Sequence, residues 1–460
     1  MKLHISSLLN RSRRNLLLAG VLAAATIALP VSPASAQTDR NWSAEQWVGT
    51  WGTGTAGPPL PAALQTFTNQ TVRLIVHTSI GGTQVRIRVS NERGSTPLVI
   101  GAAHVALRQS GADIVTGSDR VLTFSGMTSV TIPAGAPALS DPVELDVPAL
   151  ADLAVSMHLP GTVQATTIHG SAFQTNYVSF PGNFTDAAVL PTQRTITSWP
   201  FLTEVDVQAP GRAGAIVTLG DSITDGSNTT LNANRRWTDV LAQRLITTRG
   251  PFLASNNGKV DKAQLQAARN GVLGVVNRGI GGNRLLRDPG TQPLFGQAAL
   301  ARFDRDVLAT AGVEYLVVLI GINDIGHPGT SAPGEPEVTA EQLIAGYRQL
   351  IARAHIKGIT VYGATMTPFE GTVFPGYFTQ AREQIRQAVN NWTRSSDEFD
   401  AVIDFDRAVR DPSHPTRMLP AYDAGDHLHP NDLGMTAMGN AIPLELFSAR
   451  GAASLAKASK

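Results

Sequence analysis

The stretch "IVTLGDSITDGSN", residues 216–228, determines the fold that we expect for this protein. The apolar residues before Gly220 suit a strand that is buried on both faces, and Gly220-Asp221-Ser222 ends that strand. The segment "RRWTDVLAQRL" (235–245) follows, with apolar residues at helical spacing. The pattern predicts a strand, a tight turn and a helix, with Ser222 in the turn.

The same alternation of buried strands and amphipathic helices continues through residues 211–450. A helix is predicted over 339–355, where Thr339 and Gln342 form a capping box. Strands alternating with helices predict a doubly wound α/β domain with a parallel sheet. The expected strands are "AIVTLG" (215–220), "VLGVVNRG" (272–279), "YLVVLIG" (315–321), "ITVYGAT" (359–365) and "AVIDFD" (401–406).

Residues 37–210 show the period of β-structure instead. Val85, Ile87 and Val89 alternate with arginines, and Gly81-Gly82 between two such runs predicts a hairpin. Frequent short strands without helical runs predict an N-terminal antiparallel, β-sandwich-like domain. The boundary between the two domains is expected within "QAPGRAG" (208–214).

The first 36 residues differ from the rest in composition. Four basic residues come before the apolar run from Leu16 to Leu29, and "ASA" (34–36) offers small residues for cleavage. We expect a signal peptide over 1–36, and the arginine pair in "SRRNLL" (12–17) favours the twin-arginine type over the general secretory type. A retained N-terminal anchor is the alternative. The interpretation predicts a secreted or periplasmic protein with no membrane anchor after cleavage.

The charge balance and the absence of cysteine restrict the possible functions. The 460 residues include 37 basic and 36 acidic side chains, and four of the basic ones belong to the expected signal. Nothing therefore indicates nucleic acid or an anionic membrane surface as a partner. The chain has no Cys, which excludes disulfides, thiolate metal sites and Cys nucleophiles. No pattern indicates an oligomeric state.

Four polar or glycine-rich segments lie at the predicted strand ends or before the last predicted helix. They are Gly220-Asp221-Ser222, "RGIGGNR" (278–284), "GIND" (321–324) and "DHLHPND" (426–432). Open α/β sheets bind ligands at the carboxyl ends of their strands. We therefore expect these four segments to meet at one crevice.

The residue types in these segments suit acyl transfer by a serine. A serine hydroxyl needs a base within hydrogen-bond reach, and the base needs an orienting group. We predict Ser222 as nucleophile, His429 as base and Asp426, three residues before it in one turn, as orienter. An oxyanion also needs donors, for which the Ser222 N–H, Gly282 and the amide of Asn323 are candidates. Such chemistry needs no cofactor.

These motifs resemble a known family. "GDSIT", "NRGIGG", "GIND" and "DHLH" are similar, in order and spacing, to the four blocks of the GDSL/SGNH hydrolases. The resemblance implies a flavodoxin-like three-layer SGNH hydrolase domain, with the same residues as nucleophile, triad partners and oxyanion donors. The second block often has Ser where this chain has Gly281, which leaves open whether Gly281 or Gly282 provides the N–H.

Resemblance in the first half is weaker but points to a substrate class. "WVGTWGTG" (47–54) and "VHTSIGG" (76–82) resemble the secreted two-domain members of the family, including acetyl-xylan-esterase-like and other carbohydrate-esterase-like proteins. We therefore expect a secreted serine esterase for short-chain acyl or acetyl esters, with a small-molecule or polysaccharide ester as substrate. The alternatives are a long-chain lipase or acylhydrolase, and a carbohydrate-binding protein with a vestigial hydrolase domain.

Other residues have competing interpretations. Asp426, His427, His429 and Asp432 include ligand types that zinc accepts, but two histidines two positions apart point opposite ways in a strand, so no metal site is predicted. "GIGG" lacks the third glycine of a dinucleotide-binding loop. The tryptophans at 42, 47 and 51 suit sugar stacking or, as we favour, packing of the first strand.

Overall fold

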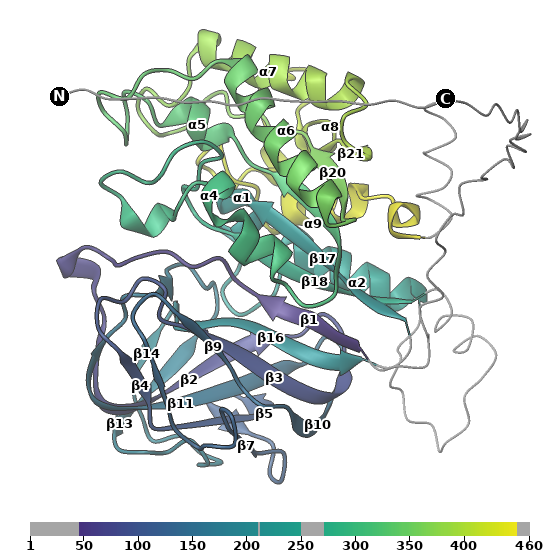
Figure 1. Ribbon diagram of the computed structural model, residues 1–460. Coiled ribbons are helices and arrows are strands. Elements are labelled where there is room, and N and C mark those ends of the chain that lie inside the picture. Colours follow the sequence, from purple (N-terminus) through teal and green to yellow (C-terminus); the bar gives the residue numbers. More distant parts are fainter. Residues whose placement is uncertain (1–45, 210–211, 250–270, 449–460) are drawn as a thin grey trace, which may run out of the picture. The chain divides into compact units, whose positions relative to one another are not determined.

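The computed structural model describes residues 46–209, 212–249 and 271–448 (Figure 1). The expected signal peptide, residues 1–36, lies outside the described residues. So do Trp42 and residues 210–211, at which the domain boundary was expected, so that the division into 37–210 and 211–450 stays a prediction.

The N-terminal half consists of antiparallel sheets, as predicted. One sheet has the strand order β1 (Gln46–Gly52), β16 (Leu202–Ala209), β3 (Gly82–Ser90) and β10 (Val143–Val147), and β9 (Pro137–Leu139) pairs with β3. The other has the order β14 (Thr192–Ile196), β13 (Asn176–Pro181), β2 (Thr66–His77), β11 (Asp152–Gln164), β5 (Ala102–Ser110) and β6 (Asp113–Ile114), and β7 (Arg120–Leu122) pairs with β5. Two short ladders join β12 (Ile168–His169) to β15 (Trp199–Pro200) and β4 (Leu98–Ile100) to β8 (Val130–Ile132). The sandwich-like arrangement of these sheets stays a prediction.

The hairpin predicted at Gly81-Gly82 is wrong. β2 pairs with β11 and β13, whereas β3 pairs with β16, β10 and β9, so the two strands belong to different sheets. The connection between them is held by β1, because the Thr50 hydroxyl accepts from the N–H groups of Ser79 (3.1 Å) and Ile80 (3.0 Å) and donates to the Ile80 carbonyl (2.7 Å). The side chain of Thr50, which is distant in sequence, therefore holds the connection from β2 to β3 as it crosses from one sheet to the other, whereas the local pattern predicted a hairpin.

The C-terminal half contains the predicted parallel sheet. Its strand order is β18 (Val272–Gly279), β17 (Ala213–Gly220), β19 (Val313–Leu319), β20 (Thr360–Ala364) and β21 (Ala401–Ile403), and every pairing is parallel. All five expected strands form. β21 ends earlier than expected, because the side chain of Asp404 accepts from the Arg407 N–H and caps the short helix α8 (Phe405–Val409). The flavodoxin-like description stays a prediction.

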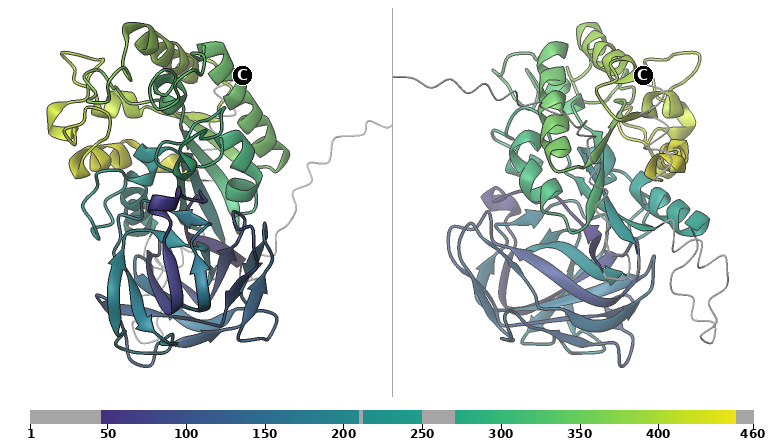
Figure 2. Two further views of the ribbon diagram at one scale, coloured as in Figure 1. Left: turned by 90° about the vertical axis from the view of Figure 1, so that its left-hand side faces the viewer. Right: turned by 45° about the vertical axis from the view of Figure 1, so that its right-hand side comes forward.

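Helices cover both faces of this sheet (Figure 1 and Figure 2). Ile216 and Val317 pack on one face against α2 (Trp237–Arg249) and α9 (Asp432–Ala441), and Val217 and Val318 pack on the other against α6 (Ala340–Ile356). The predicted capping box of α6 is present. The remaining helical segments are α1 (Ser222–Asp225), α4 (Ala299–Phe303), α5 (Ile322–Gly326), α7 (Gln380–Ser395), η1 (Pro61–Ala63), η2 (Pro293–Phe295), η3 (Asp304–Leu308), η4 (Pro420–Tyr422) and η5 (Leu444–Phe447). Within the described ranges, no helix has the length and apolar character needed to cross a membrane.

One apolar core includes residues of both halves. Val48 and Trp51 of β1 belong to the same buried cluster as Val217 and Val276 of the parallel sheet. Trp51 is 8% exposed and meets Trp199 edge to face, with ring centroids 4.9 Å apart. Its burial fits the interpretation that this tryptophan packs the first strand.

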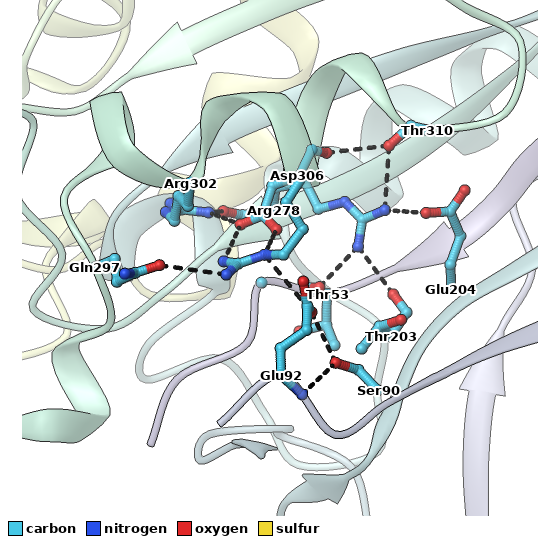
Figure 3. Close-up of polar contacts among 12 residues, drawn as sticks. Thr53, Ser90, Glu92, Thr203, Glu204, Arg278, Gln297, Arg302, Asp306 and Thr310 are labelled. Carbon is cyan, nitrogen blue, oxygen red and sulfur yellow. Dashed lines mark hydrogen bonds and ion pairs between the residues drawn. The ribbon is translucent and has the colours of Figure 1, made fainter. Parts of the chain in front are cut away.

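A buried charge cluster, which we call the Arg278 network, adds polar contacts between the halves (Figure 3). Arg278 on β18 donates to the carbonyls of Thr53 (2.7 Å) and Thr203 (2.9 Å) and pairs with the Glu204 carboxylate. Glu204 on β16 also accepts from the Ala311 N–H at 3.2 Å. Both charged side chains are almost fully buried, so each depends on the other.

Candidate active site

The turn after β17 is built by Asp221. Its side chain accepts from the Ile223 N–H at 3.0 Å and caps α1, so that Ser222 is the first residue of that short helix. This places Ser222 at the carboxyl end of β17, the edge at which ligands bind in such sheets. Burial raises the pKa of Asp221 to about 7.

Ser222, His429 and Asp426 lie in one hydrogen-bonded row. The Ser222 Oγ is 2.8 Å from Nε2 of His429, and Nδ1 of the same ring is 2.7 Å from Oδ2 of Asp426. Both partners come from the loop between η4 and α9, so one turn brings the imidazole and the carboxylate to the serine. A serine, an imidazole and a carboxylate in this order can take up and return a proton.

The carboxylate of Asp426 is held from several sides. Its Oδ1 accepts from the N–H groups of Leu428 (3.0 Å) and His429 (2.8 Å). Burial alone would raise the pKa of Asp426, but the hydrogen bonds and charge of His429 outweigh it and hold the pKa below its usual range. The carboxylate therefore stays ionised and orients the ring.

Asn228 is a site residue that the sequence did not reveal. Its Nδ2 donates to Oδ2 of Asp426 at 2.9 Å, the same oxygen that faces His429. The residue ends the stretch quoted at the start of the sequence analysis, but nothing in its type or spacing indicates a partner 198 positions away.

The two glycines of the second motif have different roles. The Gly281 N–H donates to Oδ2 of Asp225 at 3.0 Å, so it is already bonded. The Gly282 N–H has no partner within the described residues, and neither does the Ser222 N–H at the start of α1. Gly282 has a φ of +75°, and an added Cβ would lie 2.2 Å from the Phe295 ring, so the position requires glycine.

The side-chain amide of Asn323 is oriented by two neighbours. Its Oδ1 accepts from the Tyr377 hydroxyl at 2.8 Å, and its Nδ2 donates to the Asn283 carbonyl at 3.0 Å. The amide nitrogen therefore faces the loop that carries Gly282. One of its two N–H groups is still available for a ligand.

Arg302 ties the glycine loop to the end of β17. Its guanidinium donates to the Gly220 carbonyl (3.0 Å), the Arg278 carbonyl (2.7 Å) and Oδ1 of Asn283 (3.0 Å). Asn283 in turn donates to the Phe295 carbonyl at 2.7 Å. The loop is thus fixed by charge-assisted bonds and not only by packing.

Asp324 joins the third motif to the same loop. Its carboxylate accepts from the N–H groups of Leu285 (2.6 Å) and Leu286 (2.9 Å). Burial raises the pKa of Asp324 to about 6. The sequence predicted that the "GIND" motif belongs to the site, but not that its last residue accepts hydrogen bonds from the neighbouring motif.

The other histidines take different positions. His427, which belongs to the "DHLHPND" segment, pairs with Asp423 and is exposed. His327 stacks on Phe295 with ring centroids 5.2 Å apart, and burial lowers the pKa of His327 to about 4. His169, in the N-terminal half, faces the carboxylate of Asp225 at 2.9 Å. Within the part of the chain that the structure describes, no three His, Asp or Glu side chains gather in a way that suits a metal ion.

An apolar edge borders the catalytic row. Phe374 lies edge-on to His429, with ring centroids 6.4 Å apart. Phe374 is 42% exposed and its neighbour Val373 is 58% exposed. These side chains offer an apolar surface beside the imidazole.

Part of the chain matches a known protein family. Residues 216–442 match the family model described as GDSL-like Lipase/Acylhydrolase. A search of curated proteins found no match. Solved structures similar to this chain include the native aryl esterase of M. smegmatis, which is 16% identical, with the match covering 50% of this chain and 96% of that chain at a TM-score of 0.36.

Two further solved structures are similar over a slightly larger share of the chain. A carbohydrate acetylesterase from Sinorhizobium meliloti is 13% identical over 53% of this chain and 99% of its own, with a TM-score of 0.36. A GDSL-like lipase from Bacteroides thetaiotaomicron is 16% identical over 53% of this chain and 88% of its own, with a TM-score of 0.32. On the strength of the family match, residues 216–442 belong to the GDSL-like lipase/acylhydrolase family, whose members are hydrolases that act on esters.

Proposed function

We propose that this protein is a secreted serine esterase that hydrolyses carboxylic esters with short acyl groups, acetyl above all, through an acyl-enzyme on Ser222. The observation that supports the proposal most is the row Ser222–His429–Asp426, with contacts of 2.8 Å and 2.7 Å. The family of residues 216–442 supports the reaction class.

The first half of the proposed reaction forms the acyl-enzyme. Nε2 of His429 takes the proton of Ser222 Oγ as that oxygen bonds to the ester carbonyl carbon. The imidazolium is stabilised by the ionised Asp426. When the C–O bond to the alcohol breaks, the same Nε2 returns its proton to the leaving oxygen.

The tetrahedral intermediate carries a negative oxygen that needs donors. The N–H groups of Ser222 and Gly282 and the side-chain amide of Asn323 are the proposed donors. Support comes from these two backbone amides, which have no partner among the residues that the structure describes, and from the oriented Asn323 side chain. Donors already in place need no reorganisation as charge develops.

The second half releases the acid. A water molecule gives a proton to Nε2 of His429 and bonds to the acyl carbon. The bond from that carbon to Ser222 Oγ then breaks, and the serine recovers its proton from the imidazolium. Every group that takes part in these reaction steps belongs to the protein, the substrate or water.

The substrate class and the location rest on sequence patterns. The segment over 1–36 has the features of an export signal, and the N-terminal half resembles carbohydrate-esterase-like members of the family. We therefore propose acetyl groups on a polysaccharide, or on a small ester, as the substrate.

A second candidate activity is supported by the exposed apolar edge. Phe374 and Val373 could receive a longer acyl chain beside His429. Rates for p-nitrophenyl esters from acetate to palmitate distinguish the two. A maximum at acetate or butyrate supports the short-chain proposal, and a maximum at ten or more carbons contradicts it.

The basic test compares the wild type with Ser222→Ala on p-nitrophenyl acetate. We expect kcat to fall by about 10³-fold or more, because the nucleophile is removed. Ser395→Ala, which changes an exposed serine far along α7, is the matched control and should keep the wild-type rate. Equal activity in the wild type and Ser222→Ala would refute the proposed function.

A further inference from the structure

A buried carboxylate close to the proposed nucleophile has no part in the reaction above. Asp225, the last residue of α1, is 3% exposed. Its Oδ2 accepts from the Gly281 N–H at 3.0 Å, and its Oδ1 lies 2.9 Å from Nε2 of His169. Asp221 already caps α1, so Asp225 is not needed for that turn. Its carboxylate instead joins the glycine loop to the N-terminal half.

His169 belongs to β12 in the N-terminal half and is 2% exposed. Its Nδ1 lies 2.8 Å from the Gly54 carbonyl, and its Nε2 lies 2.9 Å from Oδ1 of Asp225 and 3.1 Å from the Ser171 carbonyl. Carbonyl and carboxylate oxygens can only accept, so both ring nitrogens must donate. The contacts therefore require a protonated imidazole.

The electrostatics agree with this geometry. Burial alone would lower the pKa of His169, but the charge and hydrogen bond of Asp225 outweigh burial and raise it, against an opposing effect of Arg236. Trp199 lies beside the ring, with centroids 5.5 Å apart. The electrostatic attraction between two opposite charges is stronger in such a buried environment of low dielectric constant than at the surface.

The Gly281 bond bears directly on the proposed oxyanion donor. Gly281 comes immediately before Gly282, whose N–H is unpartnered within the described residues. Anchoring the Gly281 N–H restricts the rotation of the next peptide unit. Misplacement of a reacting group by about 1 Å can cost about 10²-fold in rate.

We propose that His169 and Asp225 are positioning residues, which hold the Gly281-Gly282 loop so that the Gly282 N–H faces the oxyanion; this inference rests on the proposed function. The N-terminal half then completes the active site and is more than an accessory module. Neither residue touches the ester. Both act through the glycine loop.

The test measures kcat and KM for p-nitrophenyl acetate in His169→Gln, Asp225→Asn, Asp225→Ala and the double variant His169→Gln/Asp225→Ala. Asp225→Ala removes the acceptor and should lower kcat by about 10²-fold with KM within about threefold of the wild type. Asp225→Asn keeps an acceptor oxygen, so its kcat should lie between that of Asp225→Ala and that of the wild type. His169→Gln should lower kcat by about tenfold.

The second measurement tests whether the effects of His169→Gln and Asp225→Ala on kcat are coupled. If His169 acts through Asp225, the double variant should be no slower than Asp225→Ala alone, whereas independent effects would multiply. His104→Gln is the matched control, because His104 pairs with Asp119 at 2.8 Å elsewhere in the N-terminal half. It should leave kcat unchanged.

The outcomes separate this inference from the proposed function. If the wild type is active and Ser222→Ala is not, but folded His169→Gln has the wild-type kcat, the positioning role is wrong and the esterase proposal stands. A lower melting temperature with unchanged kcat, or a rise in KM alone, also overturns it. If the wild type hydrolyses no ester, the proposed function itself fails.

Discussion

At the level of single residues, the candidate site depends on which polar groups already form hydrogen bonds within the protein and which can still bond to a ligand. Asn323 is the clearest case. Tyr377 holds its oxygen and the Asn283 carbonyl takes one of its N–H groups, so the amide is oriented before any ligand arrives. Such preorganisation is the main source of oxyanion stabilisation in acyl transfer.

We predict that Asn323→Ala lowers kcat for p-nitrophenyl acetate by about 10²- to 10³-fold, because one oxyanion donor is lost. KM should change little, since the donor acts on the transition state. Asn391→Ala, at an exposed position on α7, serves as control. A rise in KM at constant kcat would show that Asn323 binds the ground state instead.

A second residue-scale prediction concerns pH. The pKa of His169 is raised above its ordinary value of 6.5, so its protonated form stabilises the folded state. That contribution is complete below pH 6.5 and is lost as the pH rises through the higher folded-state pKa. The difference in urea midpoint between the wild type and His169→Gln should therefore be largest near pH 6 and shrink at alkaline pH. A difference that grows with pH contradicts the protonated imidazole.

At the scale of elements, local patterns decide where strands and helices begin and end. Each expected strand of the parallel sheet formed because a short apolar run was followed by glycine or polar residues. The start of α6 is set by Thr339, whose side chain accepts from the Gln342 N–H while the Gln342 side chain accepts from the Thr339 N–H. The failed hairpin at Gly81-Gly82 shows that the same patterns do not choose strand partners.

We predict that Thr339→Ala lowers the free energy of unfolding by about 1 kcal/mol, because an N-terminal N–H of α6 loses its acceptor. Urea unfolding followed by circular dichroism measures this change. The kcat should not change, since the cap lies outside the site. Thr247→Ala, at an exposed position within α2, is the control, and an equal loss there would rule out the cap as the cause.

At the scale of the whole described molecule, the Arg278 network and the shared apolar core join the two halves. Arg278 and Glu204 come from different sheets and are buried together. Removing one member of such a pair leaves the other charge buried without that partner. Arg88 still contacts Glu204 at 3.1 Å, so the loss is not complete.

We predict that Arg278→Met lowers the free energy of unfolding by about 3 kcal/mol, near the lower end for a broken buried ion pair. Adding Glu204→Gln to Arg278→Met should recover part of the loss, because it removes the buried negative charge that Arg278 no longer helps to neutralise. Arg348→Ala breaks the exposed pair with Glu398 and should leave the urea midpoint almost unchanged. Equal shifts for Arg278→Met and Arg348→Ala would contradict this account.

Patterns in the amino-acid sequence were enough to predict the parallel α/β half, the antiparallel half and the family. It also paired Asp426 with His429 within one turn. These features follow from short-range periodicity and motif spacing, which a chain carries locally. Three of the four motif segments follow strands of one parallel sheet, and ligands bind at the carboxyl ends of such strands, so these segments were expected to meet the fourth, which carries His429, at one crevice.

Three features became visible only in the folded chain: which glycine amide has no partner among the described residues, which side chain bonds to Asp426, and which groups His169 contacts. Asp225 lies 56 positions from both Gly281 and His169, and Asn228 lies 198 positions from Asp426. A hydrogen bond between such distant positions leaves no periodic trace in the sequence. It depends on how complete sheets and loops pack, because that packing sets which donors and acceptors come within 3 Å of each other.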